Sequence, residues 1–299
     1  MIQLLPILSG IMWGAAGVFV RIFTELGMNS LTIVESRVIP AVVIIFAGLF
    51  IMDKKLLRIK LSDLWIFLCA GIFSMLGLNL CYNEAINELT LSLAAVLLCL
   101  APVFVLGLAA VFFKEKLTKQ KIICVILALI GCVLSSGVLE EIGSVKWTTF
   151  GLFIGTLGAF FYGSYSIFSK IGMMKKYHSF TITAYSLLAV AIVLLPFADW
   201  KIIGDIIESA PLKMSGFFLL HSLVTSILPY ILFTVSLNYI EAGKVAILAS
   251  SEPVAAMFFG VFFFAEIPTV LSFTGLVIVL LALGLLSVPL KRKRKTMSN

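Results

Sequence analysis

The chain has 299 residues, of which 61% are hydrophobic and 12% are charged, and its mean hydropathy is +1.16. This composition excludes a soluble globular domain and indicates an integral membrane protein. The net charge of +7 does not indicate a nucleic-acid partner, because the basic residues lie in short connections and in the tail.

Ten apolar runs are each long enough to cross a bilayer as a helix, which takes about 20 residues. They cover residues 4–24, 31–52, 64–86, 91–113, 120–138, 148–171, 178–198, 214–239, 243–265 and 270–289. The first run lacks a charged leading region and a cleavage site, so we expect a permanent helix and not a signal peptide. The connections are short, the longest polar ones being 53–63, 137–147 and 199–213, and none can hold a separate domain. We therefore expect an all-α membrane protein with ten transmembrane helices.

The sequence is internally duplicated. An offset of 151 residues, or of 149 near the start, aligns similar residues of the two halves: Pro102 with Pro253, Glu115 with Glu266, Trp13 with Tyr162, Gly14 with Gly163, and Arg21 with Lys170. Such self-similarity indicates two copies of one structural unit. We expect a first repeat over residues 1–138, a linker over 139–147, a second repeat over 148–290 and a basic tail over 291–299.

The distribution of Lys and Arg predicts the orientation of the helices. If the N-terminus is cytoplasmic, 17 basic residues lie on the inner side and four on the outer side, with Arg37 left within the membrane. Basic residues concentrate in cytoplasmic loops, so we expect both chain ends in the cytoplasm. Each repeat has five runs, an odd number, so the second must enter the membrane from the opposite side. The sequence therefore predicts two inverted five-helix repeats, an arrangement typical of transporters.

The ninth run carries an acid and a helix breaker side by side. Glu252 lies roughly 13 Å along the helix from Gly243, near the middle of the hydrocarbon core. Pro253 has no N–H, so the carbonyl of Ala249 loses its helical partner. Pro102 occupies the matching depth in the fourth run, and paired interruptions of this kind indicate a central site in transporters. The alternative is a pair of proline kinks that only improve packing.

Two charged residues within the membrane have two interpretations each. Glu252 either exchanges a proton or meets a cationic group of a substrate, or it is a structural carboxylate paired with Arg37 or Lys244. Arg37 either holds a substrate carboxylate or ties the second helix to an interior acid. Glu35 points away from Arg37 on a helix, and we expect it to be solvated near the outer surface.

Polar and aromatic residues recur at helical spacing in the third and eighth runs. Asn79, Tyr82 and Asn83 in the third run match Tyr230 and Thr234, among others, in the eighth. These residues either line a cavity for a partly apolar solute or bind neighbouring helices through hydrogen bonds. His221, in the eighth run, is either a proton relay or a core histidine.

Small residues and repeated acids complete the set of candidates. Trp13 and Gly14 lie on a small-residue face that allows close helix packing, and Trp13 could also form a wall of the site. Gly163 is the repeat equivalent of Gly14. Glu115 and Glu266 end their runs; they are either solvated surface groups or gate contacts on the two faces.

A family resemblance rests on these residues. Ten runs in two groups of five, Trp13–Gly14, Arg37, the run 91–102 ending at a proline, and Ser251-Glu252-Pro253 followed by Phe-Ala-Glu resemble the drug/metabolite transporter superfamily, EamA-like family. The resemblance covers nearly the whole chain. It implies a bacterial inner-membrane carrier of small metabolites, often amino acids and often exported.

Other classes of function find little support in the sequence. We expect no enzyme activity, cofactor or metal site, because catalytic triads, metal-ligand clusters and phosphate loops are missing and the five cysteines lie in apolar runs. We expect a secondary carrier that uses a proton or solute gradient, contacts lipid and a small-molecule substrate, and works as a monomer or homodimer. The alternatives are a multidrug or quaternary-cation efflux carrier, and a non-transporting membrane sensor or scaffold.

Overall fold

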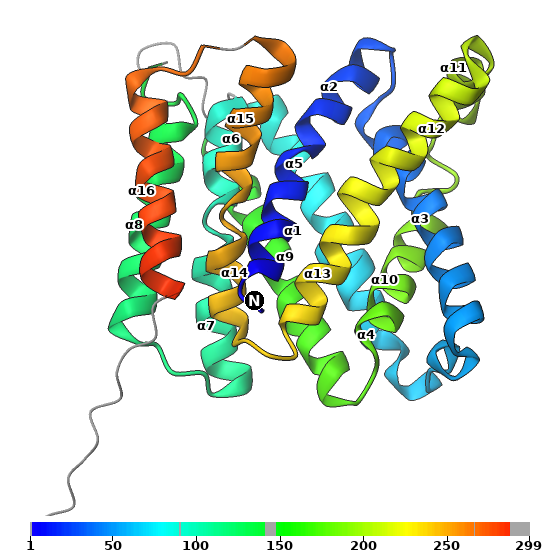
Figure 1. The fold of residues 1–299 in the computed structure, drawn as a ribbon, viewed down its shortest axis with the longest axis horizontal. Coiled ribbons are helices and arrows are strands. Elements are labelled where there is room, and N and C mark those ends of the chain that lie inside the picture. The colour runs from blue at the N-terminus through cyan, green and yellow to red at the C-terminus, as the bar shows by residue number, and fades with distance from the viewer. Residues whose placement is uncertain (1, 90, 141–147, 266, 288–299) are drawn as a thin grey trace, which may run out of the picture.

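The computed structural model describes residues 2–89, 91–140, 148–265 and 267–287, and throughout these ranges the regular structure is helical (Figure 1). Among the described residues, eight helical segments are long and apolar enough to cross a membrane. The prediction of an all-helical, multi-span membrane protein is confirmed. Glu266, residues 141–147 of the linker and the tail from residue 288 lie outside the described residues.

The helices of the first half are α1 (Leu4–Gly14), α2 (Ala16–Glu25), α3 (Ser30–Met52), the 3-10 turns η1 (Lys54–Leu57) and η2 (Leu61–Asp63), α4 (Leu64–Leu68), the π-helix η3 (Cys69–Leu76), α5 (Gly77–Glu88), α6 (Leu91–Leu98), α7 (Ala101–Phe113) and α8 (Lys119–Ser135). Those of the second half are α9 (Thr149–Met174), α10 (Ser179–Leu194), α11 (Trp200–Ser209), α12 (Pro211–Ser222), the π-helix η4 (Leu223–Ile227), α13 (Leu228–Ser236), α14 (Ala242–Ala249), α15 (Glu252–Phe264) and α16 (Val270–Ser287).

Three of the expected spans differ from the helices observed. The fifth and seventh expected spans form α8 and α10, which are 17 and 16 residues long and so lie at or just below the lower limit of about 17 residues for crossing a bilayer. The first expected span is divided at Ala15 into α1 and α2. The expected polar connection 199–213 instead contains helix α11, whose N-terminus is capped by the Asp199 carboxylate and whose Ile206 is buried.

The two halves share the same irregularities at matching positions. The spans that carry Pro102 and Pro253 are both broken, between α6 and α7 and between α14 and α15, with the proline in the first turn of the second piece. The π-helices η3 and η4 overlap when one half is shifted onto the other. Lys114 and Ala265, which end α7 and α15, both adopt left-handed backbone, with φ of 54° and 52°. The duplication therefore extends to backbone details that the sequence does not show.

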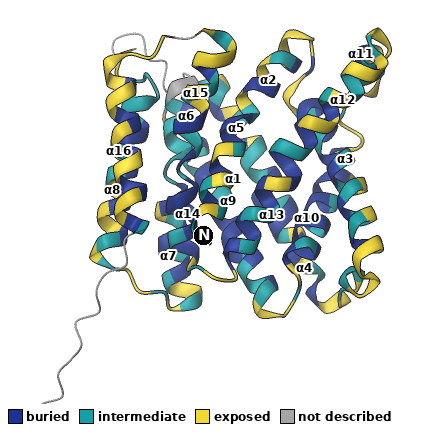
Figure 2. Cartoon of the chain, viewed as in Figure 1, coloured by how far each residue is buried: buried dark blue, intermediate teal, exposed yellow. Residues whose placement is uncertain are grey.

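The two broken spans are held by equivalent neighbours. Helix α1 packs against α13, α14 and α15, and α9 packs against α5, α6 and α7. Buried residues concentrate where these helices meet, whereas α8 and α16, packed together at one end of the molecule, expose many residues (Figure 2). Exposed side chains there are largely apolar, as lipid-facing surfaces require. Each helix break is thus covered by the first helix of a repeat.

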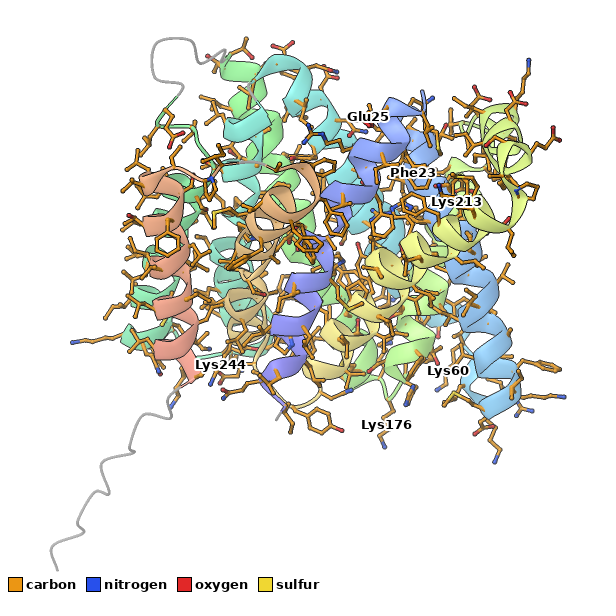
Figure 3. The ribbon with its side chains drawn as sticks, turned by 45° about the horizontal axis from the view of Figure 1, so that its top comes forward. Phe23, Glu25, Lys60, Lys176, Lys213 and Lys244 are labelled. Atoms are coloured by element: carbon orange, nitrogen blue, oxygen red, sulfur yellow. The ribbon has the colours of Figure 1, made fainter. Side chains whose placement is uncertain are left out.

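The chain begins and ends its helices on one face of the molecule. The first residues of α1 and the last of α16 lie at the bottom in Figure 1. Lys60, Lys176 and Lys244 lie at the same end, and Lys213 and Glu25 lie at the other (Figure 3). We call the end that carries Lys60 the basic face.

Candidate functional site

The break between α14 and α15 places Glu252 at the start of a helix in the middle of the molecule. Ser250 and Ser251 separate the two helices, and the Ser251 hydroxyl donates to the Ile7 carbonyl of α1 at 2.8 Å. Gly10 of α1 faces the same break, and a Cβ there would overlap Ser251. A negative carboxylate at a helix N-terminus is favoured by the helix dipole. The break therefore gives Glu252 a fixed position and a favourable end of a helix.

The Glu252 carboxylate is held from the other side by Tyr162 of α9. The Tyr162 hydroxyl donates to Glu252 Oε2 at 2.8 Å, and Glu252 is half-buried. Tyr82 and Tyr230 also lie within electrostatic range of Glu252. Among the described residues Glu252 makes no ion pair, so the interpretation that pairs it with Arg37 or Lys244 is wrong for this conformation. A charge-neutral partner leaves the carboxylate able to bind a proton or a cation.

Trp13 is the centre of an aromatic cluster beside Glu252. Its ring contacts Tyr162, Tyr230 and Phe233 at centroid distances of 5.9, 5.1 and 5.4 Å. Tyr165 extends the cluster with edge contact to Tyr230 at 5.1 Å. Edge-to-face rings present both apolar faces and hydroxyl groups. Trp13 therefore packs against α9 and α13, and its role as a wall of the site stays a prediction.

Thr234 contacts a neighbouring helix in the expected manner of a polar residue between helices. It is fully buried, and its Oγ1 lies 3.0 Å from the Tyr165 hydroxyl. The hydroxyl pair therefore joins α9 and α13, two helices of the second repeat. Tyr82 packs in a separate cluster with Ala85, at the edge of the site.

Arg37 and Asn79 lie on a small internal cavity next to Tyr230. The cavity has a volume of about 10 Å³, which is roughly the space for one water molecule, and Ser226 also lines it. Among the described residues Arg37 makes no ion pair, and its Nε is buried without a hydrogen-bond partner. The Asn79 amide donates to the Met75 carbonyl at 2.7 Å. An unpaired guanidinium beside a cavity is a ready site for a carboxylate.

Three other candidates lie away from Glu252. His221 is fully buried and stacked on Phe19, with a centroid distance of 4.9 Å, and neither ring nitrogen has a partner in the described part of the chain. It belongs to the cluster that α11 covers. Asn83 is half-buried on α5 and takes no part in the side-chain hydrogen bonds found between described residues. The expectation that Glu35 is solvated is wrong, because it is fully buried with both oxygens unpaired among described residues.

Gly14 and Gly163 press against equivalent points of the two helix breaks. A Cβ on Gly14 would lie 2.6 Å from the Glu252 carbonyl oxygen, and one on Gly163 would lie 3.1 Å from the Ala101 carbonyl oxygen. Ala101 is the repeat equivalent of Glu252. Only glycine allows such close approach without displacement. The scaffold is thus the same in both halves, but only the second half carries the acid.

Glu115 is buried, so the interpretation of this residue as a solvated surface group is wrong. Its side chain is 7% exposed, and Oε1 lies 2.6 Å from Lys170 Nζ. Glu115 also accepts from the backbone N–H groups of Ala242 and Gly243, at 2.8 and 3.3 Å, and so caps α14. Lys121 pairs with Glu115 at 3.6 Å and with Glu241 at 2.6 Å.

These contacts form what we call the Glu115 cluster, made of Glu115, Lys121, Lys170, Glu241 and the N-terminus of α14. Burial alone would raise the pKa of Glu115, but the hydrogen bonds from Lys170 and Ala242 lower that pKa below its ordinary value. At the basic face the cluster joins Glu115 and Lys121 of the first repeat to α9 and α14 of the second, across the boundary between the repeats.

A matching arrangement is present at the opposite end. The Arg21 guanidinium lies 4.1 Å above the Phe264 ring, as Lys170 Nζ lies 5.1 Å above the Phe113 ring. These are equivalent pairs in the two repeats.

Residues 1–137 and 149–288 match the EamA-like transporter family. The chain belongs to this family. As an EamA-like transporter it is a multi-span membrane transporter, which agrees with its apolar helices.

Curated relatives of this EamA-like transporter carry transporter names. Two uncharacterized transporters of Archaeoglobus fulgidus are each 27% identical, one over 80% of this chain and 82% of the relative, the other over 90% of each. The pseudopaline exporter CntI of Pseudomonas aeruginosa is 23% identical over 87% of this chain and 90% of its own length. One solved crystal structure shares the fold, with a TM-score of 0.77 and 13% identity over 96% of both chains.

Sequence reasoning on this EamA-like transporter left out three site residues. Tyr162, Tyr165 and Lys170 all lie on α9. The first two contact α15 and α13 of the same repeat, and Lys170 contacts Glu115 of the other repeat. For Tyr162 and Lys170 a signal existed, since they are the repeat equivalents of Trp13 and Arg21.

Proposed function

We propose that this protein is a secondary active transporter whose ten helices form two inverted five-helix repeats around the Glu252 site. The observation that carries the proposal is the Glu252 carboxylate at a helix break, bonded to Tyr162 of its own repeat and packed against Gly14 of the first helix of the other repeat. A fixed polar site at the interface of two similar units is the design on which alternating access depends.

Contacts between the connections support the inversion. The Lys170 end of α9 meets Glu115, which follows α7, and the Thr148 hydroxyl before α9 donates to Glu88 at the end of α5 at 2.7 Å. These contacts require α9 to run opposite to α1, which starts at the basic face (Figure 1). The concentration of lysines at that face supports a cytoplasmic location for both chain ends. We therefore propose a ten-helix carrier in the plasma membrane.

The chemistry of the site suits a small zwitterion with an apolar part. Glu252 would bind an ammonium group, Arg37 a carboxylate, and the rings of Trp13 and Tyr230 would contact the apolar part. An amino acid or a related metabolite has this combination of groups. The free guanidinium favours such a solute over a quaternary cation, which has no anionic group for Arg37.

We further propose that transport is outward and coupled to protons. A carboxylate bonded only to a phenol can exchange its cation for a proton on each cycle. Export is favoured by the relative that is named an exporter. The Glu115 cluster would hold the cytoplasmic end closed in this conformation, so that release faces outward.

The test is transport by purified protein in lipid vesicles. A mixture of amino acids and quaternary ammonium compounds is loaded, and efflux is measured by mass spectrometry with and without a pH gradient. We expect efflux of zwitterionic amino acids that the gradient accelerates. Glu252→Gln should abolish this efflux or remove its dependence on the gradient, and Tyr162→Phe should reduce it.

The matched control is Glu84→Gln, which removes an exposed carboxylate at the end of the third span and should leave efflux unchanged. Efflux of quaternary cations alone would replace the substrate assignment with the multidrug alternative. Absence of flux for every solute would favour the sensor or scaffold and overturn the proposal.

A further inference from the structure

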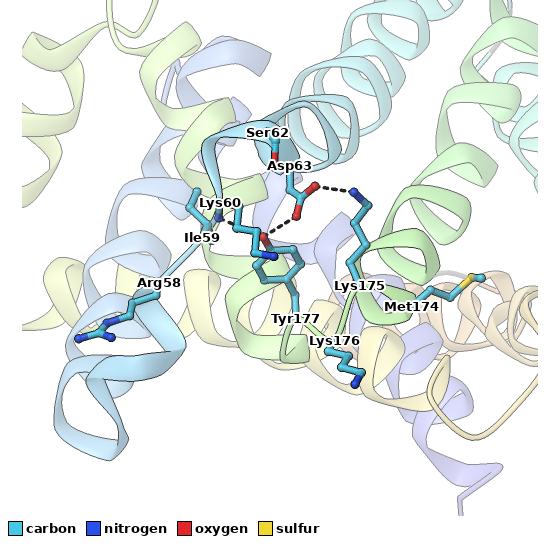
Figure 4. A pocket seen from close by; sticks show the side chains of 9 residues that line it. All are labelled: Arg58, Ile59, Lys60, Ser62, Asp63, Met174, Lys175, Lys176 and Tyr177. Atoms are coloured by element: carbon cyan, nitrogen blue, oxygen red, sulfur yellow. Dashed lines mark hydrogen bonds and ion pairs between the residues drawn. The ribbon is translucent and has the colours of Figure 1, made fainter.

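A large pocket opens at the basic face, away from the Glu252 site. It has a volume of about 650 Å³ and lies between the connection of η1 to η2 and the connection of α9 to α10 (Figure 4). It shares no residue with the small cavity of Arg37. Two loops more than a hundred residues apart in sequence thus meet to form it, and the transport site does not account for it.

Asp63 holds the two loops together, and both of its carboxylate oxygens accept hydrogen bonds within these loops. Lys175 donates to Asp63 Oδ1 at 2.5 Å, and the Tyr177 hydroxyl donates to Oδ2 at 2.8 Å. The backbone N–H of Lys60 donates in turn to the Tyr177 oxygen at 3.0 Å. Figure 4 shows this chain of bonds at the wall of the pocket. Asp63 is buried, so its charge is already neutralised by Lys175.

The other charged side chains of the pocket are all cations. Arg58, Lys60 and Lys176 are exposed, and within the described part of the chain none of them makes an ion pair. With Lys175 and Asp63 counted, the pocket carries four positive charges and one negative charge. Lys176 follows the end of α9 with φ of 66°, which fixes its backbone. A preformed pocket with a net charge of +3 fits an anionic phosphate group.

The surroundings of the pocket indicate where that phosphate comes from. Leu61, Met174 and Trp65 are 84%, 68% and 45% exposed next to the pocket residues. Apolar side chains and an indole beside cations are typical of the boundary between headgroups and acyl chains. A soluble phosphate has no apolar part that could contact these side chains.

We propose that this pocket binds the headgroup of an anionic phospholipid, with Arg58, Lys60 and Lys176 on the phosphate and the acyl chains along Leu61 and Trp65. Bound lipid would bridge the two loops and so link the third span to the sixth.

The experiment is native mass spectrometry of the full chain in detergent, titrated with phosphatidylglycerol, phosphatidylcholine or glycerol 3-phosphate. We expect at least one phosphatidylglycerol to remain bound at concentrations where phosphatidylcholine and glycerol 3-phosphate do not. The triple variant Arg58→Gln, Lys60→Gln, Lys176→Gln should weaken that binding at least tenfold. Each single substitution should weaken it by a smaller factor, so the result does not depend on the triple variant remaining folded.

The matched control is Lys114→Gln, Lys116→Gln, Lys119→Gln, which removes three charges from another connection of the same face. It should bind phosphatidylglycerol as the unmodified chain does. Equal loss in both triple variants would mean a general effect of charge and would overturn the proposal. Tight binding of glycerol 3-phosphate at the pocket would also overturn it, in favour of a soluble phosphate ligand.

Discussion

The side chains of Glu115 and Lys170 should show a coupling free energy of about 3 kcal/mol in the folded chain. Its two atoms are 2.6 Å apart, and the side chains are 7% and 19% exposed. At an effective dielectric constant of ~20 this distance gives about 6 kcal/mol of attraction. Desolvation of both ions offsets part of it, and close pairs in double-mutant cycles show coupling of about 1.5–7 kcal/mol.

The coupling is measured with Glu115→Gln, Lys170→Met and the double variant, unfolded in mixed micelles with increasing SDS. The control cycle uses Arg21 and Glu25, whose atoms are 3.7 Å apart and whose side chains are 50% and 68% exposed. An exposed helical pair of this spacing should couple by only about 0.3–0.5 kcal/mol. If the Glu115 pair couples no more strongly than the control pair, the interpretation of the Glu115 cluster as a buried link between the repeats is wrong.

Three further predictions follow from the same geometry. Gly14→Ala should lower the unfolding midpoint and slow transport, because its Cβ would lie 2.6 Å from the Glu252 carbonyl oxygen. Gly17→Ala, with open space around it, should leave stability unchanged or raise it by roughly 0.5–1 kcal/mol. Equal effects of the two substitutions would contradict the close packing at Gly14. The pKa of Glu115 lies below its ordinary value of 4.5 in the folded chain, so the stability that its charge contributes is complete above that value and is lost as the pH falls through the lowered pKa. The free energy of unfolding should therefore fall more steeply with acid for the unmodified chain than for Glu115→Gln. Parallel curves for the two proteins would contradict this prediction. Glu35→Met removes two buried oxygens that are unpaired among the described residues, so it should raise stability by about 1–3 kcal/mol. Glu35→Gln should raise stability less. A loss of stability with Glu35→Met would show that the carboxyl group has a partner.

Much of this architecture was predictable, because a bilayer restricts the backbone structures that can cross it. Apolar length located the helices, and the offset between Pro102 and Pro253 predicted two helix breaks that the structure contains. The loss of a backbone hydrogen bond at proline is a local effect, so the sequence shows it directly.

The side-chain partners were harder to predict. Tyr162 reaches Glu252 from 90 residues away, and Glu115 is buried by a helix that starts 127 residues later. Glu35 and the lysine-rich surroundings of Glu115 both suggested contact with water, and tertiary packing reversed both expectations. Pairing across an interface depends on how the repeats fit together, which no local pattern contains.

The acid stands in one repeat, and its counterpart in the other is Ala101. Two nearly identical repeats would give the two alternative packings almost equal free energies. Their difference in free energy must therefore come from the few side chains that differ between the repeats. Natural variation could then retune the preferred direction or cargo of such a protein by substituting at the two break points alone, while the helices that carry them stay unchanged.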